Sequence, residues 1–291
     1  MDHSAPNSGP VSQEPSRRRF MKGSAALGAP LGAGAPRPTP GDAQPPRQPA
    51  PPPDAPPRVV GGPMVPYGKL SRFEDAGREK GPPFLPDEWG GNFTPLANLP
   101  GIITPSALHY EVCRGGIPDI DPQKHRLLIH GMVDRPLILT MDELRRLPST
   151  SRIFFLECAG NSRSEWRGPT APKVKFTHGL TSCSEWTGVD PSLLLREDGA
   201  QQGAAWIVAG GGAATGNERS HPRAKPKDEV PVAYSPNGEA PRTGQGYPLR
   251  LMVPGWEGNV NTKWLRRIKV VDKPYMTRME SPDHTSLMPD G

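Results

Sequence analysis

The chain has 291 residues, of which 34% are hydrophobic and 40 are proline, and its formal net charge is +5. No apolar run approaches the roughly 20 residues needed to span a bilayer, so no membrane span is expected. Much of the positive excess lies at the N-terminus, in Arg17, Arg18, Arg19 and Lys22. A nucleic-acid partner is therefore not expected, because it would require basic residues clustered within a folded domain.

The N-terminal segment contains the parts of an export signal in the right order. Ser16-Arg17-Arg18-Arg19-Phe20-Met21-Lys22 combines paired arginines with an apolar residue and a lysine, and a weakly apolar stretch follows up to Ala33-Gly34-Ala35. We therefore expect residues 1–35 to be a twin-arginine signal peptide that directs the folded protein to the periplasm. A chance basic stretch in a disordered tail is the alternative.

A proline-rich stretch separates this signal from the rest of the chain. Between Pro36 and Pro57, 11 of 22 residues are proline, and apolar residues that could form a core are lacking. We expect an extended, disordered linker over residues 36–82. The next 190 residues or so have ordinary globular composition, which is enough for one substantial domain, expected over residues 83–275.

Apolar runs in this globular part are typical of strands. They are His125–Val133, Leu137–Leu139, Ile153–Cys158, Ala205–Ala209, Leu249–Val253 and Leu265–Val271. Thr140 and Glu143 match a capping box that predicts a short helix from Met141 to Leu147, and a second helix is expected from Ser192 to Glu197. Because Gly- and Pro-rich loops separate these elements, the pattern favours an α+β domain with mixed β-sheets and short helices.

The three cysteines form no CxxC or CxxCH motif, so we expect neither a structural zinc site nor haem in this chain. A disulfide between Cys113 and Cys183 is a minor alternative. Cys158 follows the apolar run Ile153–Leu156, expected to be a buried strand, and enters a polar turn that contains Arg163. A strand end can aim a thiolate into a pocket, and a nearby arginine favours the thiolate. From these residues alone, an inert core cysteine is equally consistent.

The segment Glu157-Cys158-Ala159-Gly160-Asn161-Ser162-Arg163-Ser164-Glu165 resembles the signature of the sulfite oxidase family of molybdopterin proteins. The resemblance extends from about Pro95 to Gly291, and within the family it is closest to the SoxC-like molybdenum subunits of sulfite/sulfane dehydrogenases. The other matching blocks are His125–Val133, His178–Leu180, Cys183–Val189, Tyr234–Glu239, Gln245–Arg250, Pro254–Gly258 and Asn261–Arg267.

The resemblance implies that Cys158 is the single protein ligand of molybdenum in a molybdopterin cofactor. It also implies that Arg163 lies near an anionic substrate, where fixed positive charge would orient it. The positions that would hold the anionic pterin and its phosphate are Val112, Cys113, Gln245, Arg250, Asn261, Thr262 and Lys263. Without the resemblance, Arg250 and Lys263 would be taken for surface charges at strand ends.

The implied function is periplasmic oxidation of sulfite or protein-bound sulfane sulfur by oxo transfer. Since no haem motif is present in this chain, the implied electron acceptor is a separate c-type cytochrome subunit. The resemblance implies a homodimer or heterotetramer for full-length relatives, which dimerise through a C-terminal β-sandwich. Residues 276–291 would be only the start of that region, so we expect the dimerisation domain to be missing.

The chain departs from the family at several active-site positions. Val112 stands where relatives carry an arginine, and Cys113 and Arg114 replace other polar residues. Arg114 is the candidate to reach the vacated place, and His284 falls where the family has an active-site tyrosine. Two alternatives therefore stay open: a cofactor-binding but catalytically weak paralogue or partner subunit, and a periplasmic molybdenum sulfoxide reductase.

Overall fold

The computed structural model describes residues 62–81, 89–163, 165, 168, 173–197, 199–223 and 231–283. The expected signal peptide and most of the expected linker lie outside these residues. Every element below belongs to the compact unit Gly68–Gly291. Among the described helices, none has the length and apolar character required to traverse a bilayer.

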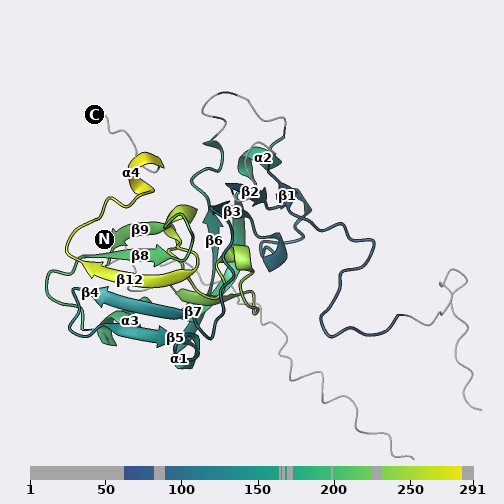
Figure 1. The fold of residues 1–291 in the computed structure, drawn as a ribbon. Coiled ribbons are helices and arrows are strands. Elements are labelled where there is room, and N and C mark those ends of the chain that lie inside the picture. The colour runs from purple at the N-terminus through teal and green to yellow at the C-terminus, as the bar shows by residue number, and fades with distance from the viewer. Residues whose placement is uncertain are drawn as a thin grey trace, which may run out of the picture. The chain divides into compact units, whose positions relative to one another are not determined.

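The described strands form three sheets (Figure 1). The smallest is antiparallel and runs in the order β1 (Glu79–Lys80), β2 (Trp89–Phe93) and β3 (Glu111–Arg114). The second is also antiparallel, in the order β11 (Arg250–Leu251), β10 (Val232–Pro236), β7 (Thr181–Val189) and β6 (Ser149–Glu157). The third has the order β5 (Leu137–Thr140), β4 (Arg126–Gly131), β12 (Leu265–Val271), β8 (Trp206–Gly211) and β9 (Glu218–Pro222). Only its β4–β12 pair is parallel.

The helices are short, as expected for an α+β domain, and this fold class is confirmed. The first begins at a capping box: the Glu143 N–H donates to Thr140 Oγ1 at 3.2 Å, and the Thr140 N–H donates to Glu143 Oε2 at 2.8 Å. This exchange satisfies two backbone donors that would otherwise lack partners at the helix start. The helices are α1 (Met141–Arg146), α2 (Lys175–His178), α3 (Pro191–Glu197) and α4 (Glu280–Asp283).

The main hydrophobic core joins the five-stranded sheet to β7, β10 and β11 of the four-stranded sheet, and helices α1 and α3 pack against it. Each fully buried Leu, Ile or Val in such a core contributes about 1.5–3 kcal/mol relative to exposure. A second, smaller cluster packs beside β3, β6 and β7 and supports the site described below. Its buried members are Tyr110, Leu156, Trp186, Ala233 and Met252.

The expectation that Ile153–Leu156 forms a buried strand is wrong in part. Strand β6 lies at the end of its sheet and, among the described strands, pairs only with β7. Because successive side chains of a strand point to opposite faces, Leu156 is 4% exposed whereas Ile153 and Phe155 are 56% and 61% exposed. The apolar run therefore belongs to an edge strand with one solvent-facing side.

The folded part also begins before the expected boundary at residue 83, because β1 (Glu79–Lys80) pairs with β2. The preceding Arg78 places its Nη1 2.5 Å from Glu111 Oε2, which ties this segment to β3. At the other end, α4 follows the expected domain limit at residue 275 and packs against β9 through Glu280, whose Oε1 accepts the Ser220 N–H at 2.9 Å. All three cysteines are free, so the Cys113–Cys183 disulfide is absent.

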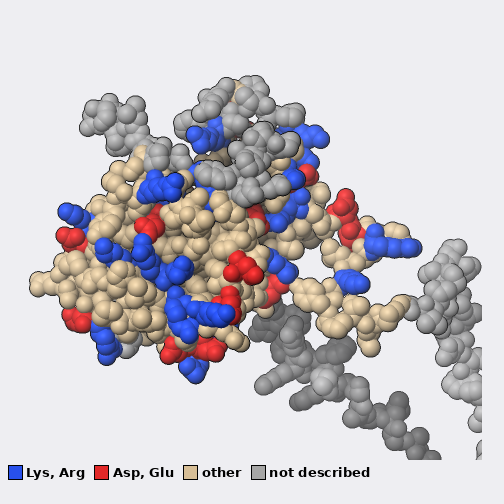
Figure 2. Space-filling model, viewed as in Figure 1, with Lys and Arg blue, Asp and Glu red and all other residues tan. Residues whose placement is uncertain are grey.

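Charged side chains of both signs share the surface. On the face shown in Figure 2, Asp and Glu side chains lie among the Lys and Arg side chains. A continuous basic surface suited to nucleic acid is therefore not formed on that face.

Candidate functional site

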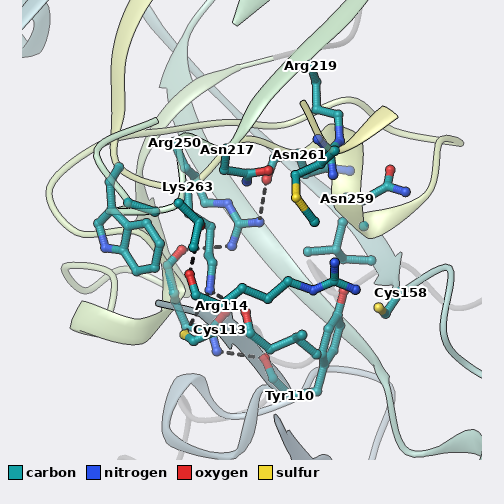
Figure 3. A pocket seen from close by; sticks show the side chains of 18 residues that line it. Tyr110, Cys113, Arg114, Cys158, Asn217, Arg219, Arg250, Asn259, Asn261 and Lys263 are labelled. Carbon is teal, nitrogen blue, oxygen red and sulfur yellow. Dashed lines mark hydrogen bonds between the residues drawn. The ribbon is translucent and has the colours of Figure 1, made fainter. Parts of the chain in front are cut away.

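A cavity lies where β3, the end of β6, the loop before β9 and the segment from Gln245 to Trp264 meet (Figure 3). Its space, counted together with the open solvent at its mouth, is about 830 Å³. It is lined by Tyr110, Val112, Cys113, Arg114, Leu156, Cys158, Ala213, Thr215, Asn217, Arg219, Gln245, Arg250, Gly258, Asn259, Asn261, Lys263, Trp264 and Met279.

Cys158 occupies the expected place, directly after β6 and at the cavity wall. The Gly160 N–H donates to its Sγ at 3.4 Å. The turn that follows is held by Asn161, whose Nδ2 donates to Glu157 Oε1 at 2.7 Å and whose Oδ1 accepts the Leu180 N–H at 3.0 Å. Burial raises the pKa of the Cys158 thiol, while the Gly160 N–H and the charge of Arg114 act in the opposite direction. A bound metal cation would further favour the thiolate.

Gly258 allows a loop to pass very close to Cys158. A Cβ at this position would lie 2.5 Å from the Tyr110 hydroxyl oxygen, 2.9 Å from the Glu157 carbonyl oxygen and 3.1 Å from the Cys158 Cα. Only glycine avoids all three contacts. The loop at Gly258 therefore lies directly against Tyr110 and the Glu157–Cys158 backbone.

Arg250 is a buried cation at the back of the cavity. Its side chain donates from Nη1 to the Gln245 carbonyl at 2.8 Å and from Nη2 to the Asn261 carbonyl at 3.4 Å. Its guanidinium carbon lies 5.0 Å from the centre of the Trp186 ring. Burial lowers the pKa of Arg250 to about 10, so the side chain stays charged near neutral pH.

Lys263 is the second cation of this inner wall. Its Nζ donates to the Val112 and Gly244 carbonyls, both at 2.8 Å, and to Cys113 Sγ at 3.4 Å. These contacts use all three ammonium donors and join β3 to the turn before Gln245. Burial lowers the pKa of Lys263.

The charge of the lining identifies the kind of ligand. Arg114, Arg219, Arg250 and Lys263 contribute positive charge, and the 18 lining residues include no Asp or Glu. Of the ion pairs formed within the described part of the chain, none involves Arg250 or Lys263. Buried charge is costly unless it is compensated. The cavity is therefore built for an anion.

The polar residues expected to hold the cofactor have a different local role. Gln245 Nε2 donates to the Tyr110 carbonyl at 2.7 Å. Asn261 Oδ1 accepts the Val253 N–H at 2.6 Å, and its Nδ2 donates to the Glu257 carbonyl at 2.9 Å. Both side chains thus shape the wall by binding backbone. Thr262 is fully buried but does not line the cavity, and its hydroxyl has no hydrogen-bond partner among the described residues.

Strand β3 brings Val112, Cys113 and Arg114 to the cavity. Val112 and Arg114 are two residues apart, so they lie on the same face of the strand. Figure 3 shows the Arg114 side chain extending across the cavity toward Cys158. The charge of Arg114 also lowers the pKa of that thiol. Arg114 therefore reaches the region that Val112 leaves without a charge.

The expected role of Arg163 near the substrate stays a prediction. In this structure Arg163 is exposed and is not among the residues that line the cavity. His284 lies outside the described residues. Met279, five residues before it, lines the cavity, so the chain passes the cavity just before that position.

Several lining residues were not anticipated. Tyr110 belongs to the segment before β3, and burial strongly raises the pKa of its hydroxyl, which is therefore neutral. Thr215, Asn217 and Arg219 belong to the loop between β8 and β9 and to β9 itself. The glycine run Gly210-Gly211-Gly212 before this loop was a usable signal, because consecutive glycines permit a close backbone approach.

This fold and its cationic, cysteine-bearing cavity define a protein that binds an anionic cofactor. Residues 114–279 match the oxidoreductase molybdopterin binding domain, and the chain belongs to this family. The SoxC-like resemblance is also borne out: the chain is similar to the crystal structure of the sulfane dehydrogenase SoxCD from Paracoccus pantotrophus, at 39% identity and a TM-score of 0.76, over 80% of this chain and 61% of that one.

Nitrate reductases are also among the similar proteins. The NADH nitrate reductase of Volvox carteri is 35% identical over 187 residues, covering 59% of this chain and 22% of that protein. The NADPH nitrate reductase of Phytophthora infestans is 32% identical over 230 residues, covering 70% and 25%. This chain thus spans about a quarter or less of these relatives, and less than two thirds of the SoxCD chain.

The residues present fit the molybdenum–molybdopterin cofactor of the family. The cofactor needs a soft ligand for the metal and positive charge for its anionic tail. Cys158 offers the thiolate at the cavity wall. The Arg250 Nε is buried without a hydrogen-bond partner among the described residues, so this donor is available to the cofactor. Lys263 would contribute by its charge, since its donors are used within the chain.

Proposed function

We propose that this chain is the molybdenum-carrying part of a periplasmic dehydrogenase that oxidises sulfite or protein-bound sulfane sulfur and passes electrons to a c-type cytochrome. The observation that carries the proposal is a cavity that combines the Cys158 thiol with four cationic side chains and no carboxylate. The similarity to the SoxCD sulfane dehydrogenase over 80% of the chain supports a sulfur compound as the substrate.

The reaction places defined demands on the protein. Oxidation of sulfite takes one oxygen from water and gives sulfate, two protons and two electrons. When bound, the molybdenum cofactor supplies the redox and oxygen-transfer chemistry. The chain would supply binding and orientation: Cys158 would hold the metal, and Arg114, whose charge acts on the Cys158 thiol, would provide fixed positive charge for the oxygens of the substrate. The neutral Tyr110 hydroxyl offers a hydrogen bond that adds no negative charge.

The test is to express the chain with a molybdenum cofactor supply and measure bound metal, released pterin and sulfite-dependent reduction of a c-type cytochrome. Cys158→Ser should lose molybdenum and turnover. Cys183→Ser is the matched control, because Cys183 lies on β7 and does not line the cavity. Full activity of the Cys158→Ser variant, or wild-type protein without molybdenum, would refute the proposal.

An Arg114 variant tests whether the protein can oxidise sulfite although Val112 stands where the family has an arginine. In a molybdenum-loaded Arg114→Gln variant we expect kcat/KM for sulfite to fall roughly 10- to 100-fold, since a hydrogen bond to a charged group contributes about 1.5–3 kcal/mol. If wild type and variant both show only trace activity with full cofactor loading, the chain is instead a cofactor-binding but catalytically weak paralogue.

Nitrate reduction is the second candidate, favoured by identities of 32–35% to nitrate reductases. It runs electrons in the opposite direction, as sulfoxide reduction would. Loaded protein should therefore be assayed with nitrate and with a sulfoxide, using a reduced dye as the electron donor. Faster oxidation of the dye than sulfite-driven cytochrome reduction would replace the proposed function.

The proposed function also includes export of the folded protein to the periplasm by the twin-arginine route. Residues 1–35 fused to a reporter that is active only after folded export should deliver it to the periplasm. When Arg17 and Arg18 are both replaced by lysine, the reporter should stay in the cytoplasm. Equal export by both fusions would contradict a twin-arginine signal.

A further inference from the structure

Four side chains connect the segment before β1 to the inner wall of the cavity. Arg78 Nη1 lies 2.5 Å from Glu111 Oε2. The Cys113 thiol donates to Glu111 Oε1 at 3.8 Å, and Lys263 Nζ donates to Cys113 Sγ at 3.4 Å. In Figure 3, Cys113 and Lys263 lie on the same side of the cavity, away from Cys158. Arg78 is therefore linked through three short contacts to a cation of the cavity.

Glu111 is a buried carboxylate close to Lys263. Its side chain is 10% exposed and does not line the cavity. Gly244 lies against both residues: its carbonyl accepts from Lys263 Nζ at 2.8 Å, and a Cβ at this position would collide with the Glu111 carboxylate. Burial lowers the pKa of Lys263, and the charge of Glu111 acts in the opposite direction. The negative charge of Glu111 therefore acts on Lys263 from behind the cavity wall.

Arg78 compensates the charge of Glu111. Its side chain is 28% exposed, and its Nη1 also donates to the His109 carbonyl at 3.5 Å. A buried charge that loses its partner is left uncompensated. With Arg78 in place, the Arg78–Glu111 pair carries no net charge, so Lys263 keeps a positive potential in the cavity. Without Arg78, the carboxylate would offset the charge of Lys263 and repel an anion.

Strand β1 is also held by contacts that do not involve Arg78. Glu79 Oε1 lies 2.6 Å from Lys175 Nζ of α2, and the Gly81 N–H donates to the Gly91 carbonyl at 3.0 Å. By contrast, no second ion pair among the described residues supplies a positive partner for the Glu111 carboxylate. The charge of Arg78 is therefore harder to replace than its contribution to holding the segment.

We propose that Arg78 is a positioning residue for cofactor binding: by neutralising Glu111, it leaves the charge of Lys263 to the anionic part of the molybdopterin cofactor. Arg78 does not line the cavity and acts through the two residues between it and Lys263. This inference rests on the cofactor of the family and not on the sulfur substrate, so it holds for either direction of electron flow.

The first experiment breaks the same ion pair from each side in molybdenum-loaded protein and follows the release of pterin during dialysis. Arg78→Gln leaves a buried negative charge, so we expect pterin release roughly 10-fold faster than in the wild type. One uncompensated charge acts with about this strength over roughly 10 Å at an effective dielectric constant of about 20. Glu111→Gln removes the negative charge and keeps the size of the side chain, so release should be no faster than in the wild type.

Two further variants test whether charge is the cause. Arg78→Lys should release pterin nearly as slowly as the wild type, because the positive charge is kept. The Arg78→Gln/Glu111→Gln double variant should also do so, because no charge is left to compensate. Arg145→Gln is the matched control, since it breaks an exposed arginine–carboxylate pair within α1, with Asp142, away from the cavity.

Thermal unfolding of the cofactor-free variants separates this role from a structural one. Arg78→Gln and Glu111→Gln both lose the ion pair and should both lower Tm, whereas only Arg78→Gln should speed pterin release. Equal acceleration of release in the two variants would make Arg78 a structural tether and overturn the proposal. Unchanged release in Arg78→Gln would overturn it as well.

A wild type without molybdenum would refute the proposed function but would still leave this inference testable. The cofactor-free chain would then be titrated with inorganic phosphate by calorimetry. Phosphate should bind Arg78→Gln roughly 10-fold more weakly than the wild type, and Glu111→Gln at least as tightly as the wild type. Equal affinity in the three proteins, or binding in none of them, would overturn the role of Arg78.

Discussion

Replacing Gly258 with alanine is expected to damage the molybdenum site without removing any ligand. The new Cβ would lie 2.5 Å from the Tyr110 hydroxyl oxygen, 2.9 Å from the Glu157 carbonyl oxygen and 3.1 Å from the Cys158 Cα. Two of the three atoms belong to the backbone and cannot rotate away. Overpacking of this kind costs about 1–3 kcal/mol. For a domain of this size, each kcal/mol lowers Tm by roughly 2–4 °C.

The assay pairs thermal unfolding of the cofactor-free chain with the molybdenum content of the loaded chain. Gly258→Ala should lower both, because the loop must move away from Cys158. The Tyr110→Phe/Gly258→Ala double variant should recover part of the stability, since the shortest contact is with the hydroxyl. Gly90→Ala is the matched control, because no atom lies within 4 Å of its added Cβ. A Gly258→Ala protein with wild-type Tm and metal content would refute the reasoning.

Further predictions concern the inner cation and the buried histidines. Lys263→Met should leave the Val112 and Gly244 carbonyls without their donor. Urea titrations of the cofactor-free chain should therefore show an unfolding free energy lower by about 1–3 kcal/mol, and the loaded variant should contain less pterin. Equal pterin content in the variant and the wild type would contradict a role of Lys263 in cofactor binding. Burial lowers the pKa of His221 to about 4, so the unfolded chain binds its proton first and stability falls as pH drops from about 6.5 toward 4. Between pH 7 and pH 5 this histidine should account for about 2 kcal/mol of lost unfolding free energy. In urea titrations, His221→Leu should therefore lose about 2 kcal/mol less than the wild type over the same pH range. His109, whose pKa burial lowers to about 3, should add a loss of the same sign, so a stability that rises on acidification would refute both assignments.

The elements that could be predicted from the sequence are those whose pattern is local. Strand β12 was predicted with its full bounds, Leu265–Val271, because its apolar residues Leu265, Ile268, Val270 and Val271 lie within one short segment. Helix α1 was predicted from the capping box, which is complete within four residues. Strand β7 was missed because it places Ser182 and Ser184 on its buried face, where both are 3% exposed or less. Those burials depend on neighbours from other parts of the chain.

In the candidate site, too, the residues within local motifs were predicted and residues placed by distant parts of the chain were missed. Cys158, Arg250 and Lys263 were predicted from ordered motifs, and the structure brings all three to one cavity. Arg219 was missed because its strand, Glu218–Pro222, has no apolar pattern and reaches the cavity only through pairing with β8. Arg163 was placed near the substrate by its motif, and in the structure it is exposed and outside the cavity lining.

The hydrogen bonds of the cavity separate residues that build it from residues that can bind a ligand. The first kind donates hydrogen bonds to backbone carbonyls and includes Gln245, Asn261 and Lys263. These residues shape the cavity wall, and Lys263 also contributes to the electrostatic potential of the cavity. Arg250 retains a buried Nε without a hydrogen-bond partner among the described residues. If every polar side chain of the cavity were bonded to the protein backbone, the cavity would be a packed polar core. The buried donor of Arg250 and the partly buried thiol of Cys158 leave the site incomplete without an anionic, metal-bearing ligand.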